Sequence, residues 1–179
     1  MGLVKYISNL FTKKITDVSS KEKPKSLPTV KSDVKKYLSK NDVYDTLQEI
    51  KKEYANIMFD DDDMIDSILA GYNMFIAGES LRRLNVGISS SDVKDICSWL
   101  SGRCSYLNRS RKAMSIGITH GIWISSGVCG HRGSDKKHDK FNGKKFPLKE
   151  GLSYYGKTYF PGHDRYCRCG YKTCEPIND

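Results

Sequence analysis

The sequence predicts an α+β protein, in which an N-terminal helical region of about four helices precedes a small β-hairpin module stapled by Cys and His side chains. Apolar residues recur at helical spacing between residues 41 and 120, and that period is lost after Gly121. Four of the six cysteines and three of the four histidines lie in residues 129–179. We therefore predict a basic flexible arm at 1–40, a helical region at 41–120 and a Cys/His-rich β module at 121–179.

Length and composition exclude several classes of protein. A chain of 179 residues suits one domain with an arm and excludes a large multidomain enzyme. No stretch of about 18 apolar residues is present, so no transmembrane helix is expected. The first residues lack the long apolar region of a secretory signal, so a reducing compartment is the expected setting for the cysteines.

The net charge of +9 is divided unevenly along the chain. Ten lysines accompany three acids in residues 1–40, five basic residues accompany twelve acids in 41–100, and fifteen accompany six in 101–179. Alternating charge of this kind indicates several partner surfaces or a chain that folds back on itself, whereas a simple nucleic-acid-binding protein is often basic throughout. The alternative is a solvated surface on which charges cluster without a role.

Residues 1–40 are expected to be an arm and linker. Apolar residues at helical spacing in 1–12 predict a short amphipathic helix, which Lys13 and Lys14 follow. Such a helix can dock into a partner groove or lie on a membrane surface, but it is short for a membrane anchor. We therefore favour an arm that orders within an assembly. The linker at 13–32 holds few residues that can be buried.

The first part of the helical region is predicted to form two helices. One apolar stripe predicts a helix over 42–58, with Asn41 or Asp42 as its N-cap. The run Asp60–Asp63 lacks the glycine and the alternating ligands of a calcium loop, so it is expected to cap the next helix and complement its dipole. That helix is predicted over 64–84. Its expected buried set is Ile65, Ile68, Leu69, Tyr72, Phe75, Ile76, Leu81 and Leu84.

The second part of the helical region is also predicted to form two helices. A short helix over 90–100 is expected, with Ser90 or Ser91 as its N-cap, and a Ser-Gly pair is expected to end it. A further helix is predicted over 105–120. His120 is expected to close it, because a cation complements the C-terminal end of a helix.

After Gly121 the sequence favours strands and turns. The run Ile122-Trp123-Ile124 is typical of a strand, and Asn142-Gly143 between two phenylalanines predicts a hairpin. The remaining tail is rich in Gly, Tyr and Lys and poor in aliphatic residues. Burial alone cannot hold such a segment together, so a staple is expected.

The Cys and His residues of the module have the composition of a zinc site. Structural zinc takes four N and S ligands in a tetrahedron, and its binding supplies folding free energy that a small core lacks. The spacings Cys-x-His and Cys-x-Cys differ from the Cys-x2-Cys of common zinc knuckles. The alternatives are free thiols beside surface histidines, or disulfides formed in an oxidising medium. The predicted structural zinc ligands are Cys129, His138, Cys167 and Cys169, with His131, His163 and Cys174 as substitutes.

Basic residues next to tyrosines in the module predict a surface that contacts phosphates or an acidic partner. Arg165, Arg168 and Lys172 alternate with tyrosines near the end of the chain. The alternative is a solvated face on which the tyrosines pack against the staple. The predicted nucleic-acid or partner contacts are Lys13, Lys14, Arg109, Arg111, Lys112, Arg165, Arg168 and Lys172.

Three segments of the module form an ordered series. They are W-I-S-S-G at 123–127, H-D-K-F-N-G-K-K-F at 138–146 and P-G-H-D-R-Y-C-R-C at 161–169. The series resembles the C-terminal module of the phage Mu F-like family, the minor head or head morphogenesis proteins of tailed phages. In that family a Trp-containing strand precedes a His, a Gly turn, a Phe and a closing Cys-Arg-Cys. The corresponding residues here are Trp123, His138, Gly143, Phe146 and Cys167-Arg168-Cys169.

The resemblance implies a structural virion component that takes part in head morphogenesis. The implied partners are the portal, other capsid proteins and packaged double-stranded DNA, within a multi-subunit assembly at the capsid interior or portal vertex. Such a protein is made in the host cytoplasm, and contact with a membrane is not expected. These expectations rest on the resemblance, which covers about residues 105–170.

No catalytic residues are predicted. The sequence contains no Ser/His/Asp set, Gly-rich phosphate loop or H-E-x-x-H helix, so an enzyme is not expected. The alternative is a metal-dependent nuclease or a toxin-like effector packaged with the phage, in which His131, Asp135 and His138 bind a metal that activates water. A regulatory zinc module of the host would need a recognition helix beside the ligands, which the sequence does not predict.

Overall fold

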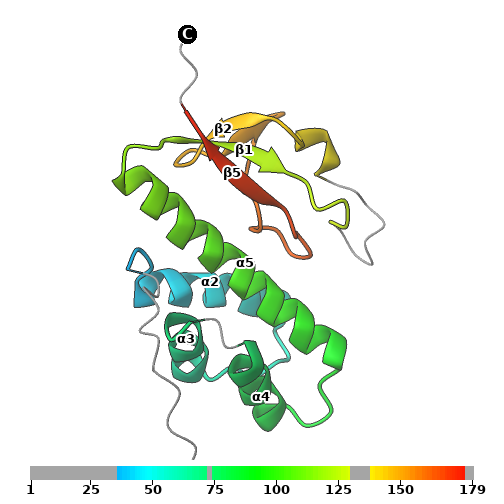
Figure 1. Ribbon diagram of the computed structural model, residues 1–179. Coiled ribbons are helices and arrows are strands. Elements are labelled where there is room, and N and C mark those ends of the chain that lie inside the picture. The colour runs from blue at the N-terminus through cyan, green and yellow to red at the C-terminus, as the bar shows by residue number, and fades with distance from the viewer. Residues whose placement is uncertain (1–35, 72–73, 130–137, 176–179) are drawn as a thin grey trace, which may run out of the picture. The chain divides into compact units, whose positions relative to one another are not determined.

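In the computed structural model, which describes residues 36–71, 74–129 and 138–175, helices are followed by small antiparallel sheets (Figure 1). The described α-helices are α2 (Lys40–Glu53), α3 (Asp61–Leu69), α4 (Met74–Leu84) and α5 (Ser90–Ser115). The strands are β1 (His120–Ile124), β2 (Lys145–Pro147), β3 (Leu152–Tyr154), β4 (Lys157–Tyr159) and β5 (Gly170–Cys174), and a short 3-10 helix, η2, spans Asp139–Phe141. The predicted α+β class is confirmed. Residues 1–35 of the predicted arm, with Lys13 and Lys14, lie outside the described residues, whereas Leu38 at its end is buried and Lys40 already begins α2.

Side-chain caps fix where the first two helices begin. Ser39 is the N-cap of α2, and its hydroxyl accepts the Asp42 backbone N–H at 3.2 Å, while the Asp42 carboxylate accepts the Ser39 N–H at 2.8 Å. The prediction of Asn41 or Asp42 as the N-cap is therefore wrong, because both lie inside the first turn. Asp60 caps α3 by accepting the N–H of Asp63, as predicted.

The helix predicted over 64–84 is two helices. The C-cap of α3 is Ala70, and Gly71 follows it with a φ of +122°, a conformation that favours glycine and ends the helix. The sequence pattern hid this break, because apolar residues continue on both sides of it. Tyr72, which was expected to be buried, lies outside the described residues.

The break changes which apolar residues of this region are buried. Ile65 and Ile68 of α3 and Leu81 of α4 are buried, as predicted. Phe75 and Ile76 were predicted to be buried as well, but their side chains are 72% and 48% exposed. The reason is that α4 starts a new helical phase after the break, which rotates its first turn towards solvent.

The helices predicted over 90–100 and 105–120 are one continuous helix, α5, of 26 residues. Its N-cap is Ser89, whose hydroxyl accepts a backbone N–H of the first turn, rather than Ser90 or Ser91. The Ser-Gly pair at its centre does not end the helix. The glycine of this pair instead allows the close approach of another segment, which is described below.

The end of α5 leads directly into the sheet. The helix ends at Ser115, and His120 is the first residue of β1, with its Nδ1 2.9 Å from the Thr119 hydroxyl. The predicted role of His120 in closing the helix is therefore wrong. The helix ends five residues earlier than the apolar pattern suggested.

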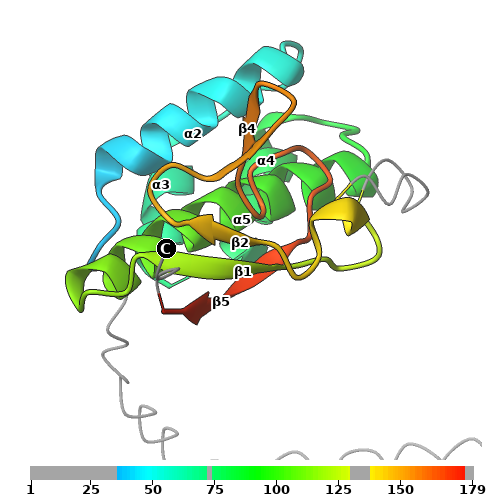
Figure 2. The ribbon, with the colours of Figure 1, turned by 90° about the horizontal axis from the view of Figure 1, so that it is seen from above.

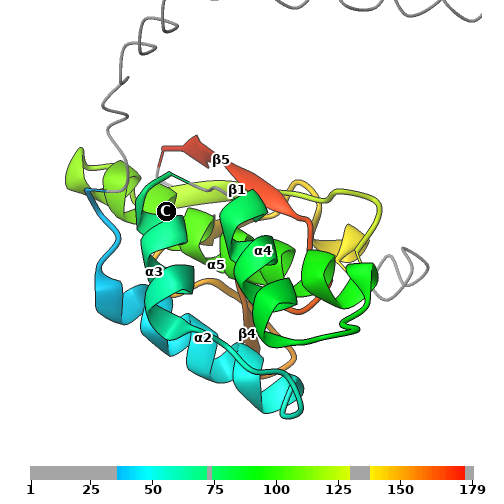
Figure 3. The same cartoon turned by 90° about the horizontal axis from the view of Figure 1, so that it is seen from below.

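One helix, α5, takes part in two hydrophobic cores. Its N-terminal half, including Val93 and Leu100, packs with α2, α3 and α4, whereas Tyr106 and Ala113 of its C-terminal half pack with the β module. The strands lie along one side of α5 (Figures 1 and 2), and α3 and α4 lie on the opposite side (Figure 3). A single rigid element therefore carries both cores.

The larger described sheet has β1 as its central strand, in the order β2–β1–β5, with antiparallel pairs. Trp123 of β1 lies opposite Tyr171 of β5, which confirms the predicted strand. The Trp123 side chain is fully buried, with its ring centroid 5.1 Å from that of Phe141 and 5.8 Å from that of Phe146. These aromatic residues form the centre of the second core.

The predicted hairpin at Asn142-Gly143 is wrong in one respect. The pair forms a tight turn, with φ +78° at Gly143 and a bond from the Lys144 N–H to the Phe141 carbonyl, but it joins η2 to β2 rather than two strands. A two-residue hairpin instead lies at Tyr155-Gly156 between β3 and β4, with φ values of +47° and +70°. Tyrosine rarely adopts positive φ, so the sequence did not indicate this turn.

Asp42 of α2 and Arg111 of α5 form a bidentate ion pair, with N–O distances of 2.6 and 2.7 Å. The hydrogen bond from Arg111 is the main cause that holds the pKa of Asp42 at about 2 instead of 3.8. Two pKa units correspond to about 2.7 kcal/mol, but Arg111 is partly exposed, so solvent screening reduces the contribution to about 1 kcal/mol.

We expect Asp42→Asn to be less stable than the native chain by about 1 kcal/mol at neutral pH. Because the pKa of Asp42 is depressed in the folded state, this stabilisation is fully present above about pH 4 and is lost as the pH falls towards 2. Urea unfolding of both chains between pH 7 and 2 measures the difference. Asp45→Asn, at an exposed position on the same helix, is the control, and an equal difference at pH 7 and pH 2 would contradict the prediction.

Candidate metal centre

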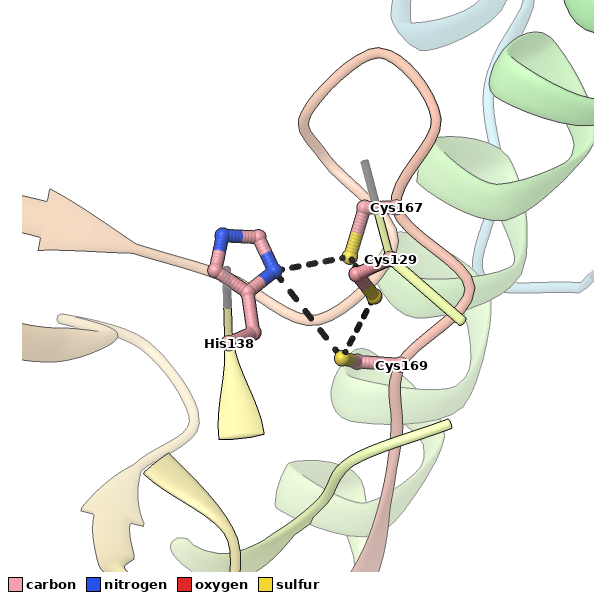
Figure 4. Close-up of side chains that lie close together, drawn as sticks. All are labelled: Cys129, His138, Cys167 and Cys169. Carbon is pink, nitrogen blue, oxygen red and sulfur yellow. Dashed lines mark hydrogen bonds between the residues drawn. The ribbon is translucent and has the colours of Figure 1, made fainter. Parts of the chain in front are cut away.

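Cys129, His138, Cys167 and Cys169 come together in space although up to 40 positions separate them in the sequence. Their ligand atoms, three Sγ and one imidazole nitrogen, all lie within 4.8 Å of one another, and all four residues are buried. Figure 4 shows the imidazole directing Nδ1 towards the sulfur atoms. This group, which we call the Cys3His cluster, can hold a metal ion.

The distances within the Cys3His cluster suit a tetrahedral ion. Cys129 Sγ lies 3.1 Å from Cys169 Sγ and 3.9 Å from Cys167 Sγ, and His138 Nδ1 lies 3.3 and 3.9 Å from the sulfurs of Cys167 and Cys169. Ligands about 2.0–2.3 Å from a central ion are separated by roughly 3.5–3.8 Å in a tetrahedron. A disulfide would need about 2.05 Å, and all six cysteines are free thiols.

Three separate segments supply the four ligands. Cys129 lies five residues after the end of β1, His138 immediately precedes η2, and Cys167 and Cys169 lie in the segment that leads into β5. Because β5 and β1 pair along their whole length, the cysteines beside their adjoining ends are brought together. The cluster therefore closes one end of the central strand pair.

Backbone N–H groups also point at the sulfur atoms. The N–H of Gly162 donates to Cys167 Sγ and that of Arg168 donates to Cys129 Sγ, each at 3.3 Å. Donors of this kind stabilise a thiolate, which is the form of cysteine that binds metal. The local backbone is thus arranged for sulfur atoms that carry negative charge.

The cluster also shifts the pKa of its members. The hydrogen bond from Cys167 is the main cause that lowers the pKa of Cys169, and the same interaction raises the pKa of Cys167. Burial acts to lower the pKa of His138, but contacts with Asp164 and Cys169 outweigh it and raise that pKa to about 9. The shifts favour an ionised Cys169 sulfur beside a protonated His138 imidazole.

His138 is held in place from several sides. Its Nε2 lies 3.2 Å from a carboxylate oxygen of Asp164, while the ring stacks on Phe141 and meets the edge of Trp123. With Nε2 next to a carboxylate, Nδ1 is left to act as the ligand. Sequence reasoning missed Asp164, whose only signal was an acid three positions before Cys167.

The segment that carries Asp164 and Cys167 is attached to the helices. The indole N–H of Trp99 in α5 donates to the His163 carbonyl at 2.5 Å, and the Arg165 guanidinium lies 4.4 Å from the ring centroid of Tyr54. These contacts join the cluster to the helical core. A change in α5 at this contact is therefore expected to affect the metal site.

The other ligands proposed from the sequence are not part of the cluster. His163 packs against the rings of Tyr106 and Phe160, at 5.1 and 4.8 Å, and burial lowers its pKa to about 4. Cys174 is the last residue of β5 and pairs with His120 across the sheet. His131, with Asp135 of the nuclease alternative, lies outside the described residues.

The basic residues predicted as contacts lie in different environments. The Arg111 guanidinium is engaged by Asp42, Arg109 lies 5.2 Å from the ring centroid of Tyr171, and Arg165 is near Glu53 as well as Tyr54. These three arginines thus have partners within the chain. Arg168, Lys172 and Lys112, the last of these in the final turn of α5, are exposed.

Comparisons with protein families, with curated proteins and with solved structures find no match to this chain. Among the described residues, no helix combines the length and the apolar content needed to cross a membrane.

Proposed function

We propose that the Cys3His cluster binds zinc as a structural ion. Three thiolates and one imidazole are the donor set that zinc prefers in structural sites. All four positions of a tetrahedron would be filled by protein side chains, and all four residues are buried. Such an ion has no open position for a water molecule or a substrate, so it stabilises the fold and does not take part in hydrolysis.

We further propose that the chain is a structural minor head protein of a tailed phage, associated with the portal and in contact with packaged DNA. The observation that carries this proposal is the cluster itself. Three of the positions that resemble the phage Mu F-like module, His138, Cys167 and Cys169, are members of one buried group that can hold a metal ion. The residues that carry the resemblance therefore have a physical reason to occur together in one sequence, because they meet at one site.

The alternative, a metal-dependent nuclease or packaged effector, has less support. A hydrolytic metal needs an open coordination position, and His138 directs its available nitrogen into the buried cluster. The closed arrangement therefore favours a structural role over a catalytic one.

Two measurements test the proposed function. Elemental analysis of protein purified without chelator or added metal is expected to give about one zinc per chain, and less than about half would contradict a structural zinc. Under the second proposal the gene belongs to a tailed phage, and density-gradient purification of the heads of that phage is expected to recover the chain with the capsid and portal. Its absence from purified heads would contradict the virion assignment.

Asp164→Asn is expected to weaken zinc binding by about 10- to 100-fold, because residues that orient a ligand typically have effects of this size. Competition with a chromophoric chelator measures the affinity. The imidazole nitrogen resonances of His138 provide a second readout, since Asp164 would fix the proton on Nε2. Glu150→Gln, a charge change at an exposed acid of the same module, is the control, and equal affinities of the three chains would contradict the assigned role.

A further inference from the structure

We infer that a second surface of the β module binds single-stranded nucleic acid. The surface consists of Lys140, Lys144, Tyr154, Tyr155 and Lys157, and we call it the Lys-Tyr patch. None of these residues belongs to the Cys3His cluster or to the contacts predicted from the sequence. The inference goes beyond the proposed function, which does not require a single-stranded ligand, and either can fail without the other.

Two ammonium groups of the patch are held against one aromatic ring. The Nζ atoms of Lys140 and Lys144 lie 4.5 and 4.8 Å from the ring centroid of Tyr154, and 5.3 and 6.0 Å from that of Phe141. Cation–π contacts of this kind restrain both side chains. Because both Nζ atoms lie within 4.8 Å of the same ring centroid, they are less than a Debye length of about 10 Å at 0.1 M salt apart, so the two charges repel each other. A phosphate bound at these ammonium groups would relieve that repulsion.

No acid neutralises the lysines of the patch within the described part of the chain. Residues 138–160 contain five lysines and only two acids. One of these acids, Asp139, is hydrogen-bonded to the Ser125 hydroxyl, and the other, Glu150, is exposed. The three lysines of the patch form no ion pair with any described acid, in contrast to Arg111 in its pair with Asp42. They therefore offer uncompensated positive charge to a polyanion.

Tyr155 adds an aromatic surface beside these charges. It stands at the tip of the β3–β4 hairpin with its side chain 90% exposed, and its φ of +47° is uncommon for tyrosine. Asn or Gly would fit such a turn with less strain, so the exposed ring needs a reason other than folding. Its ring meets the Tyr154 ring edge-on, with centroids 4.5 Å apart.

Lysines that track a phosphate backbone and an exposed ring that stacks on bases are the features that bind single strands without sequence preference. A duplex hides the faces of its bases, so it can use the lysines but not the Tyr155 ring. The geometry thus points to an unpaired strand, with phosphates at Lys140 and Lys144 and a base on Tyr155.

Fluorescence anisotropy with the full chain and a labelled oligonucleotide of about 20 nucleotides, longer than most single-strand site sizes, tests the inference. Affinity for the strand falls as salt rises, and the double variant Lys140→Ala/Lys144→Ala is expected to make this dependence shallower. The slope of log affinity against log salt should become less negative by about 1.4, or about 0.7 for each phosphate that the variant no longer neutralises. Tyr155→Asn, which suits the turn, is expected to weaken binding about tenfold, whereas Tyr155→Phe retains it. A duplex of the same length is expected to respond to the lysine variant alone.

The double variant Lys52→Ala/Lys94→Ala is the matched control, because it removes two exposed lysines of α2 and α5 and so the same charge. Circular dichroism and metal content of every variant establish that the fold is intact. The inference is overturned if the native chain does not bind the single strand, or if the control weakens binding as much as the patch variant. It is also overturned if Tyr155→Asn binds like the native chain, which would indicate charge contact without stacking.

Discussion

Cys169→Ser is expected to abolish stoichiometric zinc binding and to unfold the β module, while the helical core retains most of its helix. Three of the cluster's cysteines, Cys129, Cys167 and Cys169, are part of the module's hydrophobic core, whereas the residues of the helical core pack separately. Loss of one structural ligand removes most of a binding free energy that reaches about 10–16 kcal/mol in zinc-finger peptides. Trp123 lies 5.6 Å from His138 between ring centroids, so its fluorescence reports on the module.

The measurements are elemental analysis, tryptophan fluorescence and far-ultraviolet circular dichroism on native and variant chains. Cys97→Ala is the matched control, because Cys97 is a buried cysteine of the helical core and is not a member of the cluster. It is expected to keep about one zinc per chain with a modest loss of stability. A Cys169→Ser chain that retains full zinc and a buried Trp123 would show that the cluster is not the staple.

Gly102→Ala is expected to destabilise the protein by about 2 kcal/mol, although alanine in a helix is favoured over glycine by about 1 kcal/mol. Gly102 lies in α5 where the segment before β5 crosses it, and a Cβ there would be 2.9 Å from the carbonyl oxygen of Gly162. That oxygen belongs to a backbone that cannot move without shifting Asp164 and Cys167. We therefore expect weaker zinc binding in the same variant.

Gly78→Ala is the control for Gly102→Ala, because it also replaces a helical glycine. The added Cβ would meet a methyl group of Val93 at 3.3 Å, which is a side chain that can give way. This variant is expected to be neutral or slightly more stable. Urea unfolding and chelator competition compare the two variants, and equal stability and zinc affinity would contradict the role assigned to the Gly102–Gly162 contact.

Local signals in the sequence predicted much of the fold. The first part of the α2 stripe, the aspartates before α3 and the strand at Trp123 were found, because each depends on neighbours within a few positions. The helix predicted over 42–58 ends at Glu53, and Met58 is exposed. The errors lie at boundaries. Gly71 ends α3 within a continuous apolar pattern by adopting a positive φ, and α5 continues through its Ser-Gly pair. The weak helix propensity of glycine therefore marks a helix end in one place and not in the other.

The candidate site divides in a similar way. The sequence indicated the types of ligand, and it placed the four members of the cluster first among seven candidates. This was possible because soft N and S donors that are concentrated in a segment with a small core have few other uses. Asp164 and the close approach of Gly102 to Gly162 were not found. Both depend on how the segment before β5 returns to α5, which no local pattern encodes. The Lys-Tyr patch was not found from the sequence, because its residues come from two segments, one around η2 and the other the β3–β4 hairpin. The sequence also did not indicate that hairpin, since Tyr155 is an unusual residue for its turn.

By itself, the sequence determined the α+β class of the chain and the Cys and His side chains that are candidates for a metal site in its C-terminal part. The tertiary structure decided which of those side chains meet. Pairing of β1 with β5 brings Cys129 to Cys167 and Cys169, and Asp164 orients His138 towards them. The physical reason is that the composition of a segment determines how much free energy it can gain from burial, and so whether another source of stability is expected. Only strand register and helix packing determine which distant atoms lie within coordination distance.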